Sequence, residues 1–160
     1  HEAGHRVVVV DNLSRRGAAE NLEWLRSRGV ADFVRADIRD QAAMDDLMAR
    51  HADADVVLHL AAQVAVTTSV ADPRADFDIN ALGTFNVLEA VRTRAGGRPA
   101  VFYSSTNKVY GNLEHERVVE RDGRYAYADR THGVDEDERL DFHSPYGCSK
   151  GAADQYVLDY

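Results

Sequence analysis

Two residues near the end of the chain, Tyr146 and Lys150, have types and a spacing that could do acid–base chemistry. Ser144-Pro145 before them is typical of a helix start, because proline already has the dihedral of the first turn and lacks an N–H that would go unpaired there. Residues i and i+4 of a helix share one face, so the phenol and the ammonium would be neighbours. A nearby cation favours the phenolate, and a phenolate could take a proton from an alcohol at neutral pH.

The free energy that this chemistry requires is modest. A free tyrosine has a pKa of about 10, and lowering it by about three units takes roughly 4 kcal/mol, which one ammonium and a second cation could supply. A Tyr-x-x-x-Lys pair alone proves little, since a half-buried tyrosine beside a lysine is common in helices. The interpretation therefore depends on the elements that position the pair.

Composition describes an ordinary globular chain. It has 160 residues, 44% hydrophobic and 29% charged, which suits one α/β domain or a piece of a larger one. The net charge of −8, with no basic block, argues against nucleic acid or an anionic membrane as the main partner. The lone Cys148 excludes an intrachain disulfide framework. With no membrane-length apolar run and no signal peptide at the start, we expect a cytoplasmic location.

Short apolar runs rich in β-branched residues alternate with amphipathic segments. Strands are expected over residues 6–10, 32–36, 56–60 and 100–104, and helices over 18–28, after Asp40, over 77–94 and from 144 onward. Continuous apolar runs are typical of strands buried on both faces of a parallel sheet. The alternation predicts right-handed βαβ units and an α/β fold, a Rossmann-like doubly wound parallel sheet.

Apolar positions at helical spacing predict the core. They are Leu22, Trp24 and Leu25 on the first helix, Met44, Leu47 and Met48 on the second, and Phe77, Ala81, Phe85, Leu88 and Val91 on the third. Asp40 should cap the second helix. Asn80 lies beside the third stripe and needs partners if it is buried, so it is either structural or reaches a site.

Small and polar residues follow each expected strand. They are Asp11, Asp37, Ala61-Ala62 and residues 104–106. Parallel sheets bind ligands at the carboxyl ends of their strands, so these four positions together indicate a site.

The types of these residues suit a dinucleotide. An acid at the position of Asp11 holds the adenosine ribose hydroxyls and disfavours the extra phosphate of NADP. Arg15 and Arg16 could accept that phosphate, so NAD is favoured while NADP stays open. Asp37-Ile38 could flank an adenine ring, and the small Ala61-Ala62 would let a ligand lie against the backbone.

Together these segments resemble the extended short-chain dehydrogenase/reductase family, the nucleotide-sugar epimerases and dehydratases. The matching segments are residues 11–14, 37–38, 59–62, Asn80 with Gly83-Thr84, 104–111 and 146–150. The longer strings at 104–111 and 140–160 are most similar to family members that epimerise C2 of a CDP-linked 3,6-dideoxyhexose. The resemblance implies tightly bound NAD, a nucleotide-sugar substrate and a homo-oligomer.

The resemblance also implies roles for single residues. Tyr146 would be the acid/base, Lys150 would lower its pKa and hold the nicotinamide ribose, and Thr106 would hydrogen-bond the reacting hydroxyl. The NAD site would be lined by Asp11, Asn12, Ser14, Asp37, Ile38, Ala61, Ala62, Gln63, Asn80, Ser104, Tyr146 and Lys150. The sugar C2 hydroxyl would be oxidised, the 2-keto intermediate would rotate, and the hydride would return to its other face.

Alternatives remain. Dehydratases of the family carry Asp-Glu where this chain has Asn107-Lys108, which counts against dehydration. A 4-epimerase is the closest rival, and a non-catalytic dinucleotide sensor is a more distant one. The long segment 113–143 could cover the sugar or the nucleotide, or be a solvated excursion or a subunit contact. The histidines at 115, 132 and 143 lack a metal-ligand spacing with Cys148, so no metal is expected.

The glycine-rich turn that binds a pyrophosphate should precede Asp11 by roughly 20 positions. We therefore expect residues 1–160 to be a partial NAD-binding Rossmann domain, without its first strand and without a C-terminal substrate domain. In a 3-2-1-4-5 order the missing strand would lie between the strands at 6–10 and 56–60. We expect a gap or a non-native contact there rather than a ladder of hydrogen bonds.

Overall fold

The computed structural model describes residues 3–30, 32–130 and 132–160. The strands are β1 (Val8–Asp11), β2 (Asp32–Arg35), β3 (Val56–His59), β4 (Ala100–Tyr103), β5 (Val118–Arg121) and β6 (Arg124–Tyr127). The helices are α1 (Ala18–Ser27), α2 (Gln41–Arg50), α3 (Val66–Ala71), α4 (Pro73–Phe77), α5 (Gly83–Arg94) and α6 (Ser144–Asp159), with a π-helical turn η1 (Asp78–Leu82) and a 3-10 turn η2 (Asn107–Tyr110). None of the described helices is long and apolar enough to cross a membrane.

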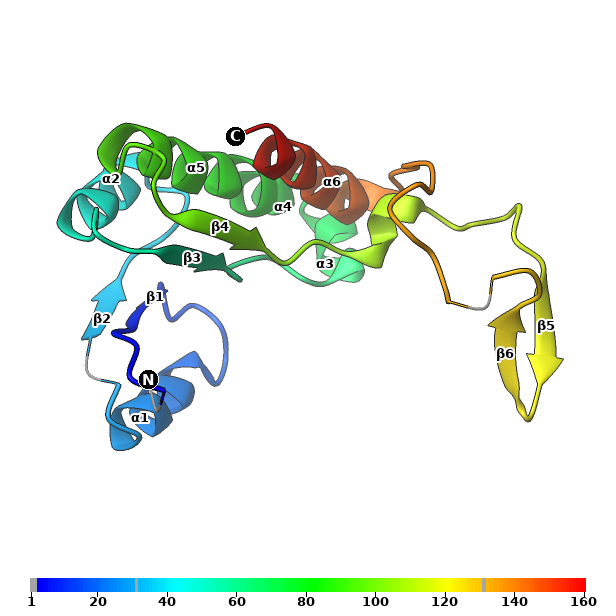
Figure 1. Ribbon diagram of the computed structural model, residues 1–160, viewed down its shortest axis with the longest axis horizontal. Coiled ribbons are helices and arrows are strands. Elements are labelled where there is room, and N and C mark those ends of the chain that lie inside the picture. The colour runs from blue at the N-terminus through cyan, green and yellow to red at the C-terminus, as the bar shows by residue number, and fades with distance from the viewer. Residues whose placement is uncertain (1–2, 31, 131) are drawn as a thin grey trace.

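The strands form three separate pairs. β1 lies parallel to β2, and β3 lies parallel to β4, whereas β5 and β6 form an antiparallel hairpin. Within the described residues no ladder joins β1 to β3, so the predicted break in the sheet is confirmed. Figure 1 shows the β1–β2 pair and α1 standing apart from β3–β4.

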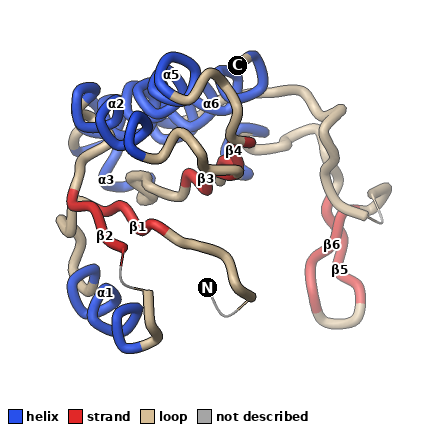
Figure 2. Tube along the Cα trace, turned by 60° about the vertical axis from the view of Figure 1, so that its left-hand side comes forward, coloured by secondary structure: helices blue, strands red, loops and turns tan. Residues whose placement is uncertain are grey.

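The main core lies between the helices and one face of β3–β4, and both views show α2, α5 and α6 gathered there (Figures 1 and 2). Its buried members are Met44, Leu47, Met48, Val87, Ala90, Val91 and Ala95. The three predicted core residues of α2 are thus confirmed. The predicted cap is confirmed as well, because the Asp40 carboxylate accepts a hydrogen bond from Ala43 N at 3.1 Å.

The opposite face of β3–β4 is open. Leu58 is 65% exposed and Phe102 is 60% exposed, and Val56 and Leu60 are also exposed. Side chains alternate between the two faces of a strand, and the described helices cover one of them. The prediction that these strands are buried on both faces is therefore wrong for this pair.

Two predicted core residues are exposed as well. Trp24 is 62% exposed and Leu22 is buried; residues two apart on a helix point in nearly opposite directions, so both could not face inward. Phe77 is 53% exposed. The helix predicted from 77 begins at Pro73 and passes through η1, and Asp76 and Asn80 take the buried positions of this stretch.

Segment 113–143 leaves the body after η2 and carries the β5–β6 hairpin (Figure 1). Arg130 closes its base by donating hydrogen bonds to the carboxylates of Glu116 and Glu138. The end of the segment is anchored to η2, where Asp141 N donates a hydrogen bond to Val109 O at 2.9 Å.

Candidate active site

Tyr146 and Lys150 are both buried on α6. The helix begins at Ser144 with Pro145 in its first turn, as the sequence predicts. Tyr146 N donates a hydrogen bond to Ser69 Oγ of α3 at 3.1 Å, which fixes that first turn. The i, i+4 spacing thus places the phenol and the ammonium on the inner face of one helix.

The ammonium of Lys150 is held by β4. Nζ donates a hydrogen bond to Ser104 O at 2.5 Å and lies 4.0 Å from the centre of the Tyr103 ring. Burial lowers the pKa of Lys150 to about 8, while the carboxylates of Asp154 and Asp76 oppose that change. The side chain therefore remains a cation at neutral pH, and its charge is stabilised by a carbonyl and by an aromatic face.

Thr106 stands at the same end of β4, where its Oγ1 caps η2 by accepting a hydrogen bond from Lys108 N at 3.3 Å. This turn packs against the start of α6: a Cβ at Gly147 would lie 3.2 Å from Lys108 O. A side chain at position 147 would therefore require this turn to shift by a few tenths of an ångström. The structure thus brings the Thr106 turn to the helical turn that carries Tyr146.

The ends of β1 and β2 are tied together. Asp11 Oδ1 accepts a hydrogen bond from Leu13 N at 2.6 Å, and Asn12 Nδ2 donates to Asp37 Oδ2 at 2.8 Å. Arg39, which the sequence did not single out, pairs with Asp37 at 2.7 Å and holds the pKa of that carboxyl well below its usual range. The exposed Asp11 carboxylate is left at the strand end, as predicted.

Ser14 and Ile38 complete this part of the predicted site. Ser14 N donates to Asn12 Oδ1 at 2.9 Å. Ile38 lies against α5, where a Cβ at Gly83 would be 2.7 Å from Ile38 Cδ1. The glycine therefore provides the room in which the Ile38 side chain sits.

The end of β3 is joined to α4 and η1. Ala61 is exposed and Ala62 half-buried, while the Gln63 side chain turns inward and donates to Asp76 Oδ1 at 2.7 Å. Asn80 is fully buried: Oδ1 accepts from Gln63 N at 2.9 Å, and Nδ2 donates to Gln63 O at 3.1 Å. The contacts of Asn80 support its structural alternative, and a role for it in binding a cofactor stays a prediction.

His59 is a buried member of the site that sequence reasoning missed as an ionisable group. Its Nε2 lies 2.9 Å from Thr84 Oγ1, and that hydroxyl donates its single proton to Asn80 O at 2.6 Å. Nε2 must therefore carry the hydrogen. Burial, and secondarily the charge of Lys150, lowers the pKa of His59 to about 4, so the ring is neutral.

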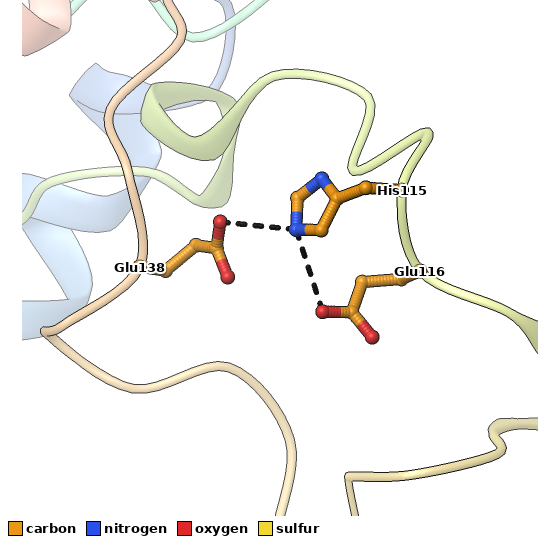
Figure 3. Close-up of side chains that lie close together, drawn as sticks. All are labelled: His115, Glu116 and Glu138. Atoms are coloured by element: carbon orange, nitrogen blue, oxygen red, sulfur yellow. Dashed lines mark ion pairs between the residues drawn. The ribbon is translucent and has the colours of Figure 1, made fainter.

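A second cluster lies at the base of segment 113–143 (Figure 3). His115 Nε2 is 3.4 Å from Glu116 Oε1 and 3.3 Å from Glu138 Oε1, and such groups can hold a metal ion. Arg130 already pairs with both carboxylates, and they raise its pKa. The cluster is thus an ion-pair network. Sequence spacing could not reveal it, because Glu138 joins from a distant part of the segment.

A family model described as GDP-mannose 4,6 dehydratase matches residues 1–160. The chain is 52% identical over 157 residues to a CDP-paratose 2-epimerase from Salmonella typhi, covering 98% of this chain and 46% of that protein. The solved UDP-Glc/GlcNAc 4-epimerase of Campylobacter jejuni superposes with a TM-score of 0.80 at 26% identity, covering 99% of this chain and 42% of that one. A UDP-glucose 4-epimerase from Stenotrophomonas maltophila, solved with bound NAD and formylated UDP-arabinopyranose, gives a TM-score of 0.76 at 34% identity, covering 99% and 42%.

Two parallel strand pairs, their covering helices and a Tyr-x-x-x-Lys helix define a Rossmann-like α/β protein of the epimerase and dehydratase type. The chain belongs to the GDP-mannose 4,6 dehydratase family. The predicted family and fold class are thereby confirmed. The chain spans less than half the length of these three relatives.

Proposed function

We propose that the whole protein is an NAD-dependent nucleotide-sugar epimerase that inverts C2 of a CDP-linked 3,6-dideoxyhexose, as a CDP-paratose 2-epimerase does. One observation carries the catalytic part of this proposal. The Lys150 ammonium is fixed between Ser104 O and the Tyr103 ring, on the helix face that bears Tyr146. The C2 position and the CDP group are supported by the 52% identity to the Salmonella typhi protein.

In the proposed reaction Tyr146 exchanges a proton with the C2 hydroxyl, and Thr106 orients that hydroxyl by a hydrogen bond. Lys150 stabilises the phenolate form of Tyr146 by its positive charge. NAD, held by the predicted cofactor residues, would supply the hydride chemistry at C2 when it is bound. The residues of this chain bind and orient the nucleotide sugar, and they move the proton.

The predicted cofactor residues suit NAD. The exposed Asp11 carboxylate is an acceptor for two ribose hydroxyls, and its charge disfavours a 2′-phosphate. Ile38, half-buried against Gly83, offers an apolar contact for an adenine ring. Ala61 and Ala62 keep the end of β3 free of bulky side chains.

Two other reactions of the family are weighed by particular residues. Dehydration is disfavoured, because Asn107 and Lys108 replace the acid pair that eliminates water. A UDP-glucose 4-epimerase is the second candidate, since Thr106, Tyr146 and Lys150 would serve it equally well and several relatives carry that name.

We place segment 113–143 over the nucleotide sugar. A cavity of 440 Å³ opens between this segment and η2, lined by Asn107, Lys108, Tyr110, Gly111, Asn112, Leu113, Tyr127 and Val134. Tyr127 and Val134 come from the segment, and Lys108 comes from the turn that Thr106 caps. A cation and aromatic rings are groups that a nucleotide diphosphate and its sugar can contact.

The test is to incubate the whole protein with CDP-paratose and with UDP-galactose in deuterated water and to follow the sugar by NMR. We expect inversion at C2 of CDP-paratose with protium retained there, because the hydride returns from the cofactor, and no change at C4 of UDP-galactose. Tyr146→Phe should abolish turnover. Change at C4 alone would establish the second candidate. If the unchanged protein turns over neither nucleotide sugar, and Tyr146→Phe leaves its function unchanged, the protein would be a dinucleotide sensor.

A further inference from the structure

A buried carboxylate that the proposed mechanism does not use lies behind α6. Asp76, on α4, is 1% exposed. Its Oδ2 accepts a hydrogen bond from Ser149 Oγ at 2.5 Å, and its Oδ1 accepts from Gln63 Nε2 at 2.7 Å and Asn80 Nδ2 at 3.2 Å. These donors come from three separate parts of the chain, so the carboxylate joins the end of β3, η1 and α6.

The three donors are neutral. No ion pair found among residues 3–30, 32–130 and 132–160 includes Asp76, although a buried charge usually requires a cation or a full set of donors. Ser149, the donor on α6, immediately precedes Lys150. Asp76 thus both fixes this turn of the helix and lies close enough for its charge to act on the ammonium.

The surroundings of Lys150 show why a negative charge is needed there. β3 contributes the neutral His59, β4 contributes the Tyr103 ring and the Ser104 carbonyl, and α6 itself contributes Asp154 and Tyr146. Burial disfavours the ammonium, and Asp154 and then Asp76 favour it. Without Asp76 the ammonium would lose its proton at a lower pH.

We propose that Asp76 is a positioning residue of the epimerase: it holds the Ser149 turn of α6 in place and keeps the buried ammonium of Lys150 charged. The proposal rests on the proposed function, in which that ammonium stabilises deprotonated Tyr146. Asp76 acts through Lys150 and does not touch the substrate.

The first test replaces Asp76→Asn in the whole protein and measures kcat against pH. Asparagine keeps the size and one acceptor oxygen but removes the charge. In the unchanged enzyme kcat should fall as the pH rises through about 8, because Lys150 is deprotonated there. In the variant this fall should move to lower pH by about one pH unit.

A second readout does not depend on turnover. The chain has two lysines, Lys108 and Lys150. Acetylation followed by peptide mass spectrometry reports how the free amine of each develops with pH, and the exposed Lys108 serves as the internal reference. The Lys150 profile should shift to lower pH in Asp76→Asn while the Lys108 profile stays in place.

Two controls separate charge from packing. Ser149→Ala removes the hydroxyl that contacts Asp76, Asn80 and Tyr146 O but keeps the carboxylate, so it should lower stability and leave both pH profiles in place. Asp46→Asn, at an exposed carboxylate paired with Arg50, should change neither. Asp76→Ser is the second charge-free variant, should Asp76→Asn not fold, and the same shift is expected.

An Asp76→Asn enzyme that is less stable but keeps both wild-type pH profiles would overturn the proposal. Failure of the proposed function is a different result. An unchanged protein that turns over no nucleotide sugar would refute the epimerase, while the Lys150 acetylation profile would still show whether Asp76 supports the charge.

Discussion

Burial sets the charge of two basic side chains at the site, with opposite outcomes. Lys150 keeps its proton at neutral pH because a carbonyl, an aromatic ring and two carboxylates compensate for lost water. His59 loses its proton, because burial disfavours the charged ring and, secondarily, Lys150 adds a like charge. A neutral imidazole beside a buried ammonium avoids placing two cations in one apolar space.

This contrast predicts how stability depends on pH. The folded pKa of His59 is about 4 against an ordinary value of 6.5, so below pH 6.5 the unfolded chain binds a proton that the folded chain rejects. Stability should therefore fall by about 2 kcal/mol between pH 7 and pH 5 from this residue alone. Urea unfolding at the two pH values measures it. His59→Gln, which retains a donor toward Thr84, should lose this dependence, whereas the exposed His132→Gln should keep it.

Residues with local signals could be predicted from the sequence. Tyr146, Lys150 and the Asp40 cap follow from helix spacing and capping chemistry, and the strand-end position of Asp11 follows from the apolar run before it. Asp76 and Tyr103 could not be predicted. Their roles depend on contacts between segments far apart in the sequence, and neither has a distinctive pattern around it.

The close approach of α6 to the rest of the chain depends on its glycines. A Cβ at Gly151 would lie 2.5 Å from two atoms of the Phe142 ring, and one at Gly147 would lie 3.2 Å from Lys108 O. The Phe142 ring therefore covers Gly151 from the segment that leads into the helix. This packing holds α6 close enough to the rest of the chain for Tyr146 and Lys150 to be buried.

Gly151→Ala should therefore destabilise the protein even though alanine favours a helix. The overlap with Phe142 should cost about 1–3 kcal/mol, against a propensity gain of about 1 kcal/mol. Thermal unfolding measures the difference. Adding Phe142→Leu should recover part of the loss, and Gln155→Ala, at an exposed position of α6, is the matched control. A Gly151→Ala protein more stable than the parent would show that the ring moves away at little cost.

Elements were predictable where periodicity decides them, and less so where tertiary packing does. The four parallel strands and the helices α1, α2, α5 and α6 follow the sequence pattern closely. The π-helical turn η1 has no pattern of its own and displaces Phe77 to the surface. The hairpin of β5 and β6 was not predicted, although its turn is Asp122-Gly123, a dipeptide typical of two-residue hairpin loops, and both residues have positive φ.

The separation of β1 from β3 bears on cofactor binding. The residues expected to contact NAD are distributed over both strand pairs, and the glycine-rich turn for the pyrophosphate was not found in the sequence. Binding of a pyrophosphate depends strongly on backbone N–H groups at the start of a helix. The predicted NAD residues therefore do not include a helix start that would bind the pyrophosphate.

We accordingly expect the 160-residue chain to bind NAD weakly, and the whole protein to bind it tightly. Isothermal titration calorimetry on both measures the difference. In the whole protein, Asp11→Ala should weaken NAD binding relative to the unchanged protein, because the ribose loses its acceptor. Tight binding by the chain alone would show that the strand ends suffice without the phosphate-binding turn.

The uncovered side of β3–β4 has a practical consequence for such measurements. The apolar side chains of Leu58, Leu60 and Phe102 are exposed to solvent there, on a molecule that is acidic overall. Two copies that met through this side would hide it from solvent, so self-association should grow with concentration and with added salt, which weakens the repulsion of like charges. Dilute, low-salt solutions are where the chain will stay monodisperse.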